Sequence, residues 1–218
     1  YCDPGRADAL LEQALKIARA VGDRMLVAQV QREQIHIELY RGRVDRAIQA
    51  GEGSLAAARE IDSPEQLAYT LNGIWCAYRE AGLIDKGREG LAAAGAIFRE
   101  MGNKPMIANV LSSLSVSEFM RGDYESALRL CAEARLLTEQ SGNPWGQAFS
   151  SMVVAWVHFE RGDVGQAIRV WEEGLRLAET GGLAVLLSYW RADLASCYRF
   201  AGADDLADGH LQAAQELT

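Results

Sequence analysis

Three histidines and four cysteines are the side chains in this sequence best suited to bind a metal ion or to attack a substrate. They are His36, His158, His210, Cys2, Cys76, Cys131 and Cys197. A transition-metal site needs three or four converging ligands, and phosphate-binding and zinc motifs need a fixed spacing. The sequence has no CxxC pair, no glycine-rich phosphate loop and no nucleophile elbow. We therefore predict no catalytic residue, no metal and no cofactor.

One pair of these residues falls in the same position of two neighbouring repeats, which are described below. His36 and Cys76 are forty residues apart, and Glu33 lies about one helical turn from His36. A metal or redox site at this place is one interpretation. We favour the other, a histidine in a binding groove beside a packed thiol, because transition-metal sites need three or four converging ligands.

The composition is that of an acidic, helix-forming protein. The 218 residues carry a formal net charge of −8, and Ala, Leu, Arg, Glu and Gln dominate over β-branched residues. An acidic surface repels phosphate groups, and no apolar run approaches the roughly 20 residues that span a bilayer, so neither nucleic acid nor membrane is expected as a partner. Well-separated cysteines are typical of reduced thiols. We therefore expect a cytoplasmic location, with three of the four cysteines packed as small hydrophobic residues.

Small residues recur with a period of forty. One glycine series is Gly42, Gly82, Gly122, Gly162 and Gly202; a second is Gly22, Gly102, Gly142 and Gly182, with Asp62 in the remaining position. Five residues after the first series come Ala47, Gly87, Ala127, Ala167 and Ala207, and Ala7 fits the same grid. A glycine that ends a helix adopts a left-handed conformation and lets the chain turn. Two such stops per period predict pairs of antiparallel helices of about seventeen residues, with the alanine positions at close helix–helix contacts.

Helix start signals agree with this spacing. Ser63 and Asn143 each precede a proline, which is typical of an N-cap followed by proline at the first helical position. Asp123 and Asp163 are placed to cap the second helix of their pairs, and Gln166 is placed to complete a capping box with Asp163. The predicted elements are a leading helix (4–21) and five hairpins (24–61, 64–101, 104–141, 144–181 and 184–217).

Two segments resemble a known repeat. The strings RGDYESALRLCAEA (121–134) and RGDVGQAIRVWEEG (161–174) resemble the second helix of a tetratricopeptide repeat (TPR), with its Gly-Asp start and a small residue near the first turn. The resemblance covers the entire chain and implies an all-α fold, a right-handed α-solenoid of about eleven helices in a single repeat domain, 1–218. Because the chain starts and stops inside hairpins, we expect a fragment of a longer protein.

The repeats also depart from the usual TPR pattern. Their period is longer than the common spacing of about 34 residues, and Ile35, Trp75 and Ser115 replace the small residue often found mid-way along the first helix. Repeats with the longer period resemble those attached to bacterial signalling ATPase regulators, nucleotide cyclases and scaffold proteins.

Two stripes run along the predicted first helices. The first is apolar in nearly every repeat and is predicted to be core: Ile74, Leu114, Val154 and Leu194, with Leu67, Ile107 and Leu187 two turns earlier. The second, which we call the variable stripe, follows the spacing i, i+3, i+7, i+10 along each first helix, mixes aromatic residues with amides and arginines, and changes from repeat to repeat. It comprises Gln29, Arg32, His36, Leu39, Tyr69, Asn72, Cys76, Arg79, Asn109, Ser112, Val116, Phe119, Phe149, Met152, Trp156, Phe159, Tyr189, Ala192, Ser196 and Arg199. By the resemblance, it lines the concave groove. The residues that we select from it as a partner-binding groove are Tyr69, Asn72, Arg79, Asn109, Phe119, Phe149, Met152, Trp156, Phe159, Tyr189 and Arg199.

The composition of the variable stripe is that of neither a core nor a plain solvent face. Aromatic residues, Met and Arg are enriched at the centres of protein interfaces, which favours a binding surface. The alternative for any single aromatic residue is packing between neighbouring hairpins. Arg32, Arg79 and Arg199 are candidates to receive an acidic group of a ligand.

These features favour a protein–protein interaction module that binds a peptide or helix of a partner protein in its groove. The alternative is an effector-sensing or autoregulatory segment of a larger signalling protein, such as a transcription regulator, a STAND-type ATPase or a nucleotide cyclase. In that case the groove holds a small-molecule effector or an internal segment. A third hypothesis is self-association through uncapped ends, which offer Leu10, Leu11, Ala14, Ile17, Leu206, Leu211 and Leu217. Enzyme activity is not expected, because no nucleophile, base or metal set converges.

Overall fold

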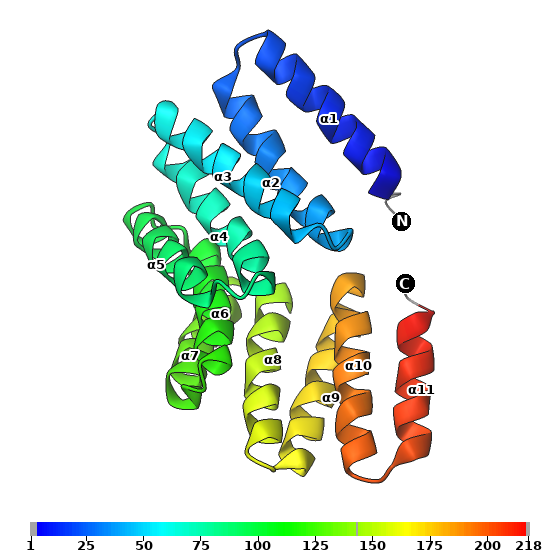
Figure 1. Cartoon of the computed structure of the whole chain (residues 1–218). Coiled ribbons are helices and arrows are strands. Elements are labelled where there is room, and N and C mark those ends of the chain that lie inside the picture. The colour runs from blue at the N-terminus through cyan, green and yellow to red at the C-terminus, as the bar shows by residue number, and fades with distance from the viewer. Residues whose placement is uncertain (1–3, 143, 217–218) are drawn as a thin grey trace. The chain divides into compact units, whose positions relative to one another are not determined.

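The structure, a computed structural model, describes residues 4–142 and 144–216. Within these residues it contains eleven α-helices and no strand (Figure 1), as the forty-residue period predicts. The helices are α1 (Pro4–Ala20), α2 (Arg24–Tyr40), α3 (Val44–Glu60), α4 (Pro64–Glu80), α5 (Ile84–Glu100), α6 (Lys104–Met120), α7 (Tyr124–Ser141), α8 (Pro144–Glu160), α9 (Val164–Thr180), α10 (Ala184–Phe200) and α11 (Asp204–Gln215). We call α2, α4, α6, α8 and α10 the first helices of their hairpins, and α3, α5, α7, α9 and α11 the second helices.

The two glycine series end the helices in the way the sequence predicts. All nine glycines have positive φ angles, from 62° at Gly142 to 79° at Gly122 and Gly162. Asp62, which occupies the remaining position, has the same left-handed conformation with φ 50°. A Cβ atom added at any of the nine glycines would meet nothing within 4 Å, so the glycine is needed for its backbone conformation alone.

Three of the predicted caps are formed. The side chain of Ser63 accepts a hydrogen bond from the backbone of Gln66, and Asp123 and Asp163 do the same at the starts of α7 and α9. The structure adds Asp23 as the cap of α2, while Asn143 lies outside the described residues. The capping box expected at Gln166 is not formed, because its side-chain oxygen accepts from Arg169 and the N–H of Asp163 donates to the carbonyl of His158.

The small-residue column lies at close helix–helix contacts, as predicted. Ala47, Ala127, Ala167 and Ala207 are completely buried. Gly87 occupies the same column, and a Cβ added there would lie 3.2 Å from the Trp75 ring. The side chain of Ala7 is outside the described part of the chain. The facing helix therefore leaves no room for a larger side chain at these positions.

The chain divides into two compact units, which we call the N-terminal unit (Tyr1–Asn103) and the C-terminal unit (Lys104–Thr218). In each unit, every helix packs on the next one along the chain. First helices also touch across hairpins, α2 against α4 in the N-terminal unit and α6 against α8 in the C-terminal unit. The variable stripe of each unit is thus carried by neighbouring first helices.

The predicted core stripe is only partly buried. Ile74 and Leu194 are completely buried, whereas Leu114 and Val154 are half-buried. Leu67, Ile107 and Leu187 are half-buried as well. Leu114 lies on α6, with which the C-terminal unit begins, so no earlier helix of that unit packs on it. Val154 lines an open cavity. The largest buried side chains of the C-terminal unit are instead Trp171 and Trp190.

No helix in the described part of the chain is long and apolar enough to cross a membrane.

Candidate functional site

In the C-terminal unit, three successive first helices contribute to one aromatic array. The rings of Phe119 on α6 and Trp156 on α8 lie 5.4 Å apart between centroids. The indole N–H of Trp156 donates a hydrogen bond of 3.1 Å to the carboxylate of Asp193 on α10. All three side chains are half-buried.

The inner side of this array is part of the core. Trp156 makes an edge-to-face contact with Trp171, at 6.2 Å between centroids, and Trp171 makes a similar contact with Trp190 at 5.7 Å. Met152, which we selected for the groove, is buried with 8% of its surface exposed and so belongs to the core. For Trp156 and Met152, the alternative interpretation of packing between hairpins therefore holds in large part.

The outer side of the array has an exposed aromatic rim. Phe159 on α8 and Phe200 on α10 make an edge-to-face contact at 5.6 Å, and Phe200 is largely exposed. Tyr189 on α10 has 68% of its surface exposed, the condition expected of a contact residue rather than a core residue. Asn109 and Phe149 are half-buried.

Asp193 is a residue that the sequence reasoning missed. Burial raises the pKa of its carboxyl above the ordinary value, and the hydrogen bond from Trp156 acts in the opposite direction. Asp193 lies four residues after Tyr189 and so is on the same side of α10. An acidic residue among apolar ones at mid-helix was the signal that could have identified it.

The N-terminal unit carries the remaining candidates. The ring of Tyr69 contacts Phe98 edge-to-face at 5.2 Å, and the guanidinium of Arg32 lies 5.3 Å from the Tyr69 centroid. Arg79 lies 5.6 Å from the Trp75 ring centroid. Tyr69, Asn72 and Arg79 are all half-buried. This face is therefore one of arginines stacked on aromatic rings.

The three arginines proposed to receive an acidic ligand already have acidic partners. Arg32 pairs with Glu33 at 2.9 Å, Arg79 with Glu80 at 2.6 Å and Arg199 with Asp208 at 2.6 Å. A ligand carboxylate would have to displace these neighbours, which lowers the net attraction.

His36 and Cys76 do not lie in a metal-binding arrangement. His36 is exposed, and burial raises the pKa of the half-buried Cys76 thiol. Burial also raises the pKa of Cys131 and of Cys197 to about 11, so both are neutral thiols at neutral pH. Cys2 lies outside the described residues. Among residues 4–142 and 144–216, no group of three or more His, Cys, Asp or Glu side chains could hold a metal ion.

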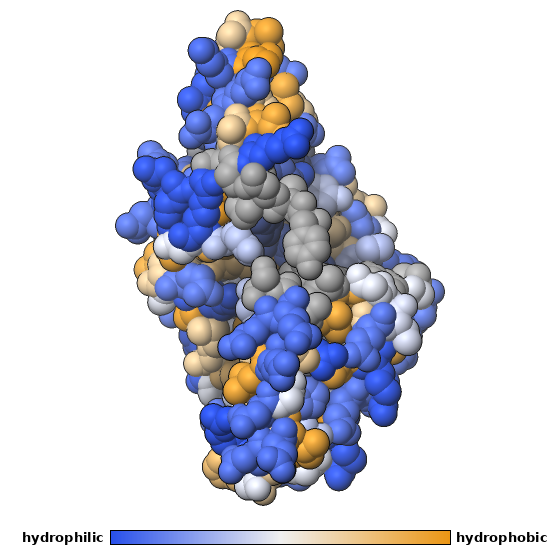
Figure 2. All heavy atoms as spheres, turned by 90° about the vertical axis from the view of Figure 1, so that its right-hand side faces the viewer, coloured by the Kyte–Doolittle hydropathy of each residue, from blue (hydrophilic) through white to orange (hydrophobic). Residues whose placement is uncertain are grey.

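Apolar side chains are also exposed on α1 and α11, the first and last helices of the repeats. On α1, Leu10 and Ile17 are exposed, as are Leu206 and Leu211 on α11. Figure 2 shows such apolar patches in orange among the charged side chains of α1, in the upper part of the view. Leu217 lies outside the described residues.

No family model and no curated protein matches the sequence. Solved structures do resemble the fold. BtubC (BKLC) from P. vanneervenii is 20% identical, with a TM-score of 0.69 over 100% of this chain and 91% of that chain. A STAND signal-transduction ATPase from Pyrococcus horikoshii, which has a tetratricopeptide repeat sensor, is 14% identical, with a TM-score of 0.71 over 94% of this chain and 33% of that chain. The chain has a TPR-type fold.

A third structure with this TPR-type fold contains a bound peptide. The Rap conjugation gene regulator of the plasmid pLS20, solved with a Phr peptide, is 14% identical to this chain, with a TM-score of 0.78. The alignment covers 92% of this chain and 55% of the regulator, so this TPR chain spans about half the length of that protein.

Proposed function

We propose that this TPR chain is a protein-interaction module, and that the first-helix face of its C-terminal unit binds a peptide segment or helix of a partner protein. The observation that carries the proposal is the array of Phe119, Trp156 and Asp193, which come from three successive first helices. Half-buried aromatic side chains held by their neighbours lose little entropy on binding and are the usual anchors of interfaces.

The chemistry of the face indicates the ligand. Tyr189 and Phe200 are exposed aromatic residues, and the half-buried Phe159 contacts Phe200, whereas Arg199 is paired with Asp208. The ligand therefore binds mainly through apolar side chains rather than through a carboxylate. The Rap regulator solved with a Phr peptide supports a peptide ligand, because its fold resembles this one over most of the chain.

A second candidate uses the same surface within a larger protein. The neighbouring STAND ATPase carries its TPR array as a sensor, and a similar role here would make the ligand an effector or an internal regulatory segment. The large exposure of Tyr189 fits an open surface better than a closed pocket around a small molecule. We therefore place a peptide segment before a small-molecule effector.

The test is a peptide-library selection on the intact chain, followed by titration of the enriched peptides against single variants. Tyr189→Ala and Phe159→Ala remove surface rings, and we expect each to weaken binding about tenfold or more. Tyr40→Ala is the control, because Tyr40 is similarly exposed but lies on α2 of the N-terminal unit, outside the proposed surface. Equal affinity of all three variants and the wild type would refute this surface as the binding site.

A further inference from the structure

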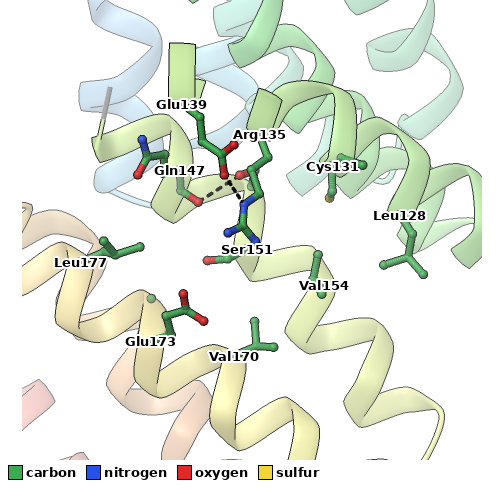
Figure 3. A pocket seen from close by; sticks show the side chains of 13 residues that line it. Leu128, Cys131, Arg135, Glu139, Gln147, Ser151, Val154, Val170, Glu173 and Leu177 are labelled. Atoms are coloured by element: carbon green, nitrogen blue, oxygen red, sulfur yellow. Dashed lines mark hydrogen bonds and ion pairs between the residues drawn. The ribbon is translucent and has the colours of Figure 1, made fainter. Parts of the chain in front are cut away.

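An open cavity with a volume of about 230 Å³ lies between α7, α8 and α9 of the C-terminal unit (Figure 3). Leu128, Val154, Val170 and Leu177 form the apolar part of its wall. In Figure 3, Arg135 and Ser151 lie on one side of the space and Glu173 on the other. The cavity thus combines an apolar interior with charged side chains at its mouth.

The cavity coincides with a change of residue type at three positions of its wall. Eighty residues earlier, two repeats back along the chain, the equivalent junction of α3, α4 and α5 in the N-terminal unit has Leu55, Leu67 and Leu71. Leu55 belongs to a buried core cluster there, and the other two leucines pack against the cluster. In the C-terminal unit the counterparts are Arg135, Gln147 and Ser151, and all three line the cavity. Protein interiors are normally close-packed, and the contrast between these two equivalent junctions makes the second one a candidate site.

The mouth of the cavity has an excess of negative charge. The guanidinium of Arg135 is paired with the carboxylate of Glu139 at 2.7 Å, so these two charges compensate each other. Glu173 is exposed and has no ion-pair or hydrogen-bond partner within the described residues. The whole chain also carries a net charge of −8. A ligand with a positive charge next to its apolar group is therefore favoured over one with a negative charge.

The size of the cavity suits a single side chain. Sites for drug-sized ligands have volumes of roughly 300–1,000 Å³, whereas an apolar cavity of about 150 Å³ is enough for benzene. The apolar surface continues beyond the mouth onto α7, where Ala132 lines the cavity and Leu136, one helical turn later, has 60% of its surface exposed. A small molecule inside the cavity would leave Leu136 uncovered, but a polypeptide would cover it.

We propose that this cavity is a second docking site, which receives one aromatic or aliphatic side chain of a partner protein flanked by a lysine or arginine that pairs with Glu173. The site is separate from the surface described above, which we call the aromatic face and which carries Phe119, Trp156 and Tyr189. Successive residues of a helix are rotated by about 100°, so Ser151 lies on the opposite side of α8 from Phe149. The two proposals can therefore fail independently.

The experiment is an NMR titration of the intact chain with two matched blocked dipeptides, N-acetyl-phenylalanyl-lysine amide and N-acetyl-phenylalanyl-glutamate amide. We expect the lysine peptide to shift the methyl signals of Leu128, Val154 and Val170, with an affinity at least about threefold above that of the glutamate peptide. Ser151→Leu restores the residue type of the filled junction, and we expect it to weaken both peptides about tenfold or more. Tyr189→Ala, on the first-helix surface, should leave the peptide-induced shifts of Leu128, Val154 and Val170 unchanged.

A second variant keeps the test independent of how well Ser151→Leu folds. Glu173→Lys changes an exposed side chain, and we expect it to reverse the order of the two peptides. Binding by Ser151→Leu at wild-type affinity, or the same peptide order in Glu173→Lys as in the wild type, would overturn the proposal. Shifts confined to Trp156 and its neighbours would overturn it as well, because they would place the peptide on the aromatic face.

Discussion

The indole nitrogen of Trp156 on α8 and the carboxylate of Asp193 on α10 are joined by a hydrogen bond of 3.1 Å, which links the first helices of two successive hairpins. The bond satisfies a polar atom that the aromatic array would otherwise bury. It also places a carboxyl group where burial raises its pKa. Ionised Asp193 therefore lowers the free energy of unfolding, and this effect depends on pH.

We predict that Asp193→Asn keeps the bond to Trp156 and makes the chain as stable as the wild type or more stable at pH 7. Because the folded-state pKa of Asp193 is raised, its contribution is most favourable below the unfolded-state pKa and is lost as the pH rises through the folded-state pKa. The advantage of the asparagine variant should therefore shrink as the pH falls through the raised folded-state pKa of Asp193, and it should be gone below the unfolded-state value of about 4. Urea unfolding of both proteins at several pH values measures this difference in stability. A stability advantage of the asparagine variant that grew in acid would contradict a raised pKa of Asp193.

The buried alanine column should not tolerate larger side chains. Ala127 and Ala167 are completely buried between the two helices of their hairpins, so Leu at either position forces extra methylenes into a close contact. We expect a loss of about 1–3 kcal/mol in the free energy of unfolding. Ala92→Leu on α5 is the matched control, because Ala92 is exposed, and it should change stability by less than about 0.5 kcal/mol. Chemical denaturation of the three variants decides the point.

The positions with positive φ that end the helices allow two opposite substitutions to be compared, aspartate to glycine and glycine to alanine. Asp62 has a left-handed backbone that favours glycine, so Asp62→Gly should lie within about 0.5 kcal/mol of the wild type, since relief of strain offsets the added chain entropy. Gly82→Ala imposes a side chain on φ 73° and should cost about 1 kcal/mol, although no neighbouring atom is near. Thermal unfolding compares them. A larger loss for Asp62→Gly than for Gly82→Ala would show that the Asp62 side chain stabilises its turn.

The exposed apolar side chains of α1 and α11 lead us to predict weak self-association. Leu10, Ile17 and Leu206 each expose more than half of their surface. Apolar patches of this kind favour protein contacts. We expect concentration-dependent sedimentation that decreases in Ile17→Glu and Leu206→Glu but not in Met101→Glu, where the exposed methionine follows α5. A strictly monomeric wild type at high concentration would exclude the association.

The sequence predicts the helices better than it predicts what their side chains contact. Turns depend on single residues with positive φ, so Gly22 or Gly162 can be recognised without knowledge of the rest of the fold. The burial of Met152 and Val154 depends on the size of side chains in other helices, and the spacing along one helix does not contain that information. For this reason the variable stripe was predicted as a surface, although Trp156 also reaches the core.

The cavity was missed for a related reason. Reading the columns across repeats would have shown Leu67 and Leu71 replaced by Gln147 and Ser151, which is a visible signal. Whether such a replacement leaves empty space or is filled by a neighbour depends on the facing helix, and only the structure supplies that.

The glycines in the turns and the glycines buried inside helices have opposite consequences for the exchange of hairpins between proteins. Because a Cβ added at any turn glycine would meet nothing within 4 Å, these positions place no demand on neighbouring side chains, and we expect hairpins to be duplicated, deleted or recombined most readily at these turns. Gly174 is different, since a Cβ there would lie 2.8 Å from the Trp190 ring of the next hairpin, and Gly51 is similarly pressed against Ile74. The hairpin whose second helix carries Gly174 is therefore matched to the one that carries Trp190, and the two must be inherited or transplanted together.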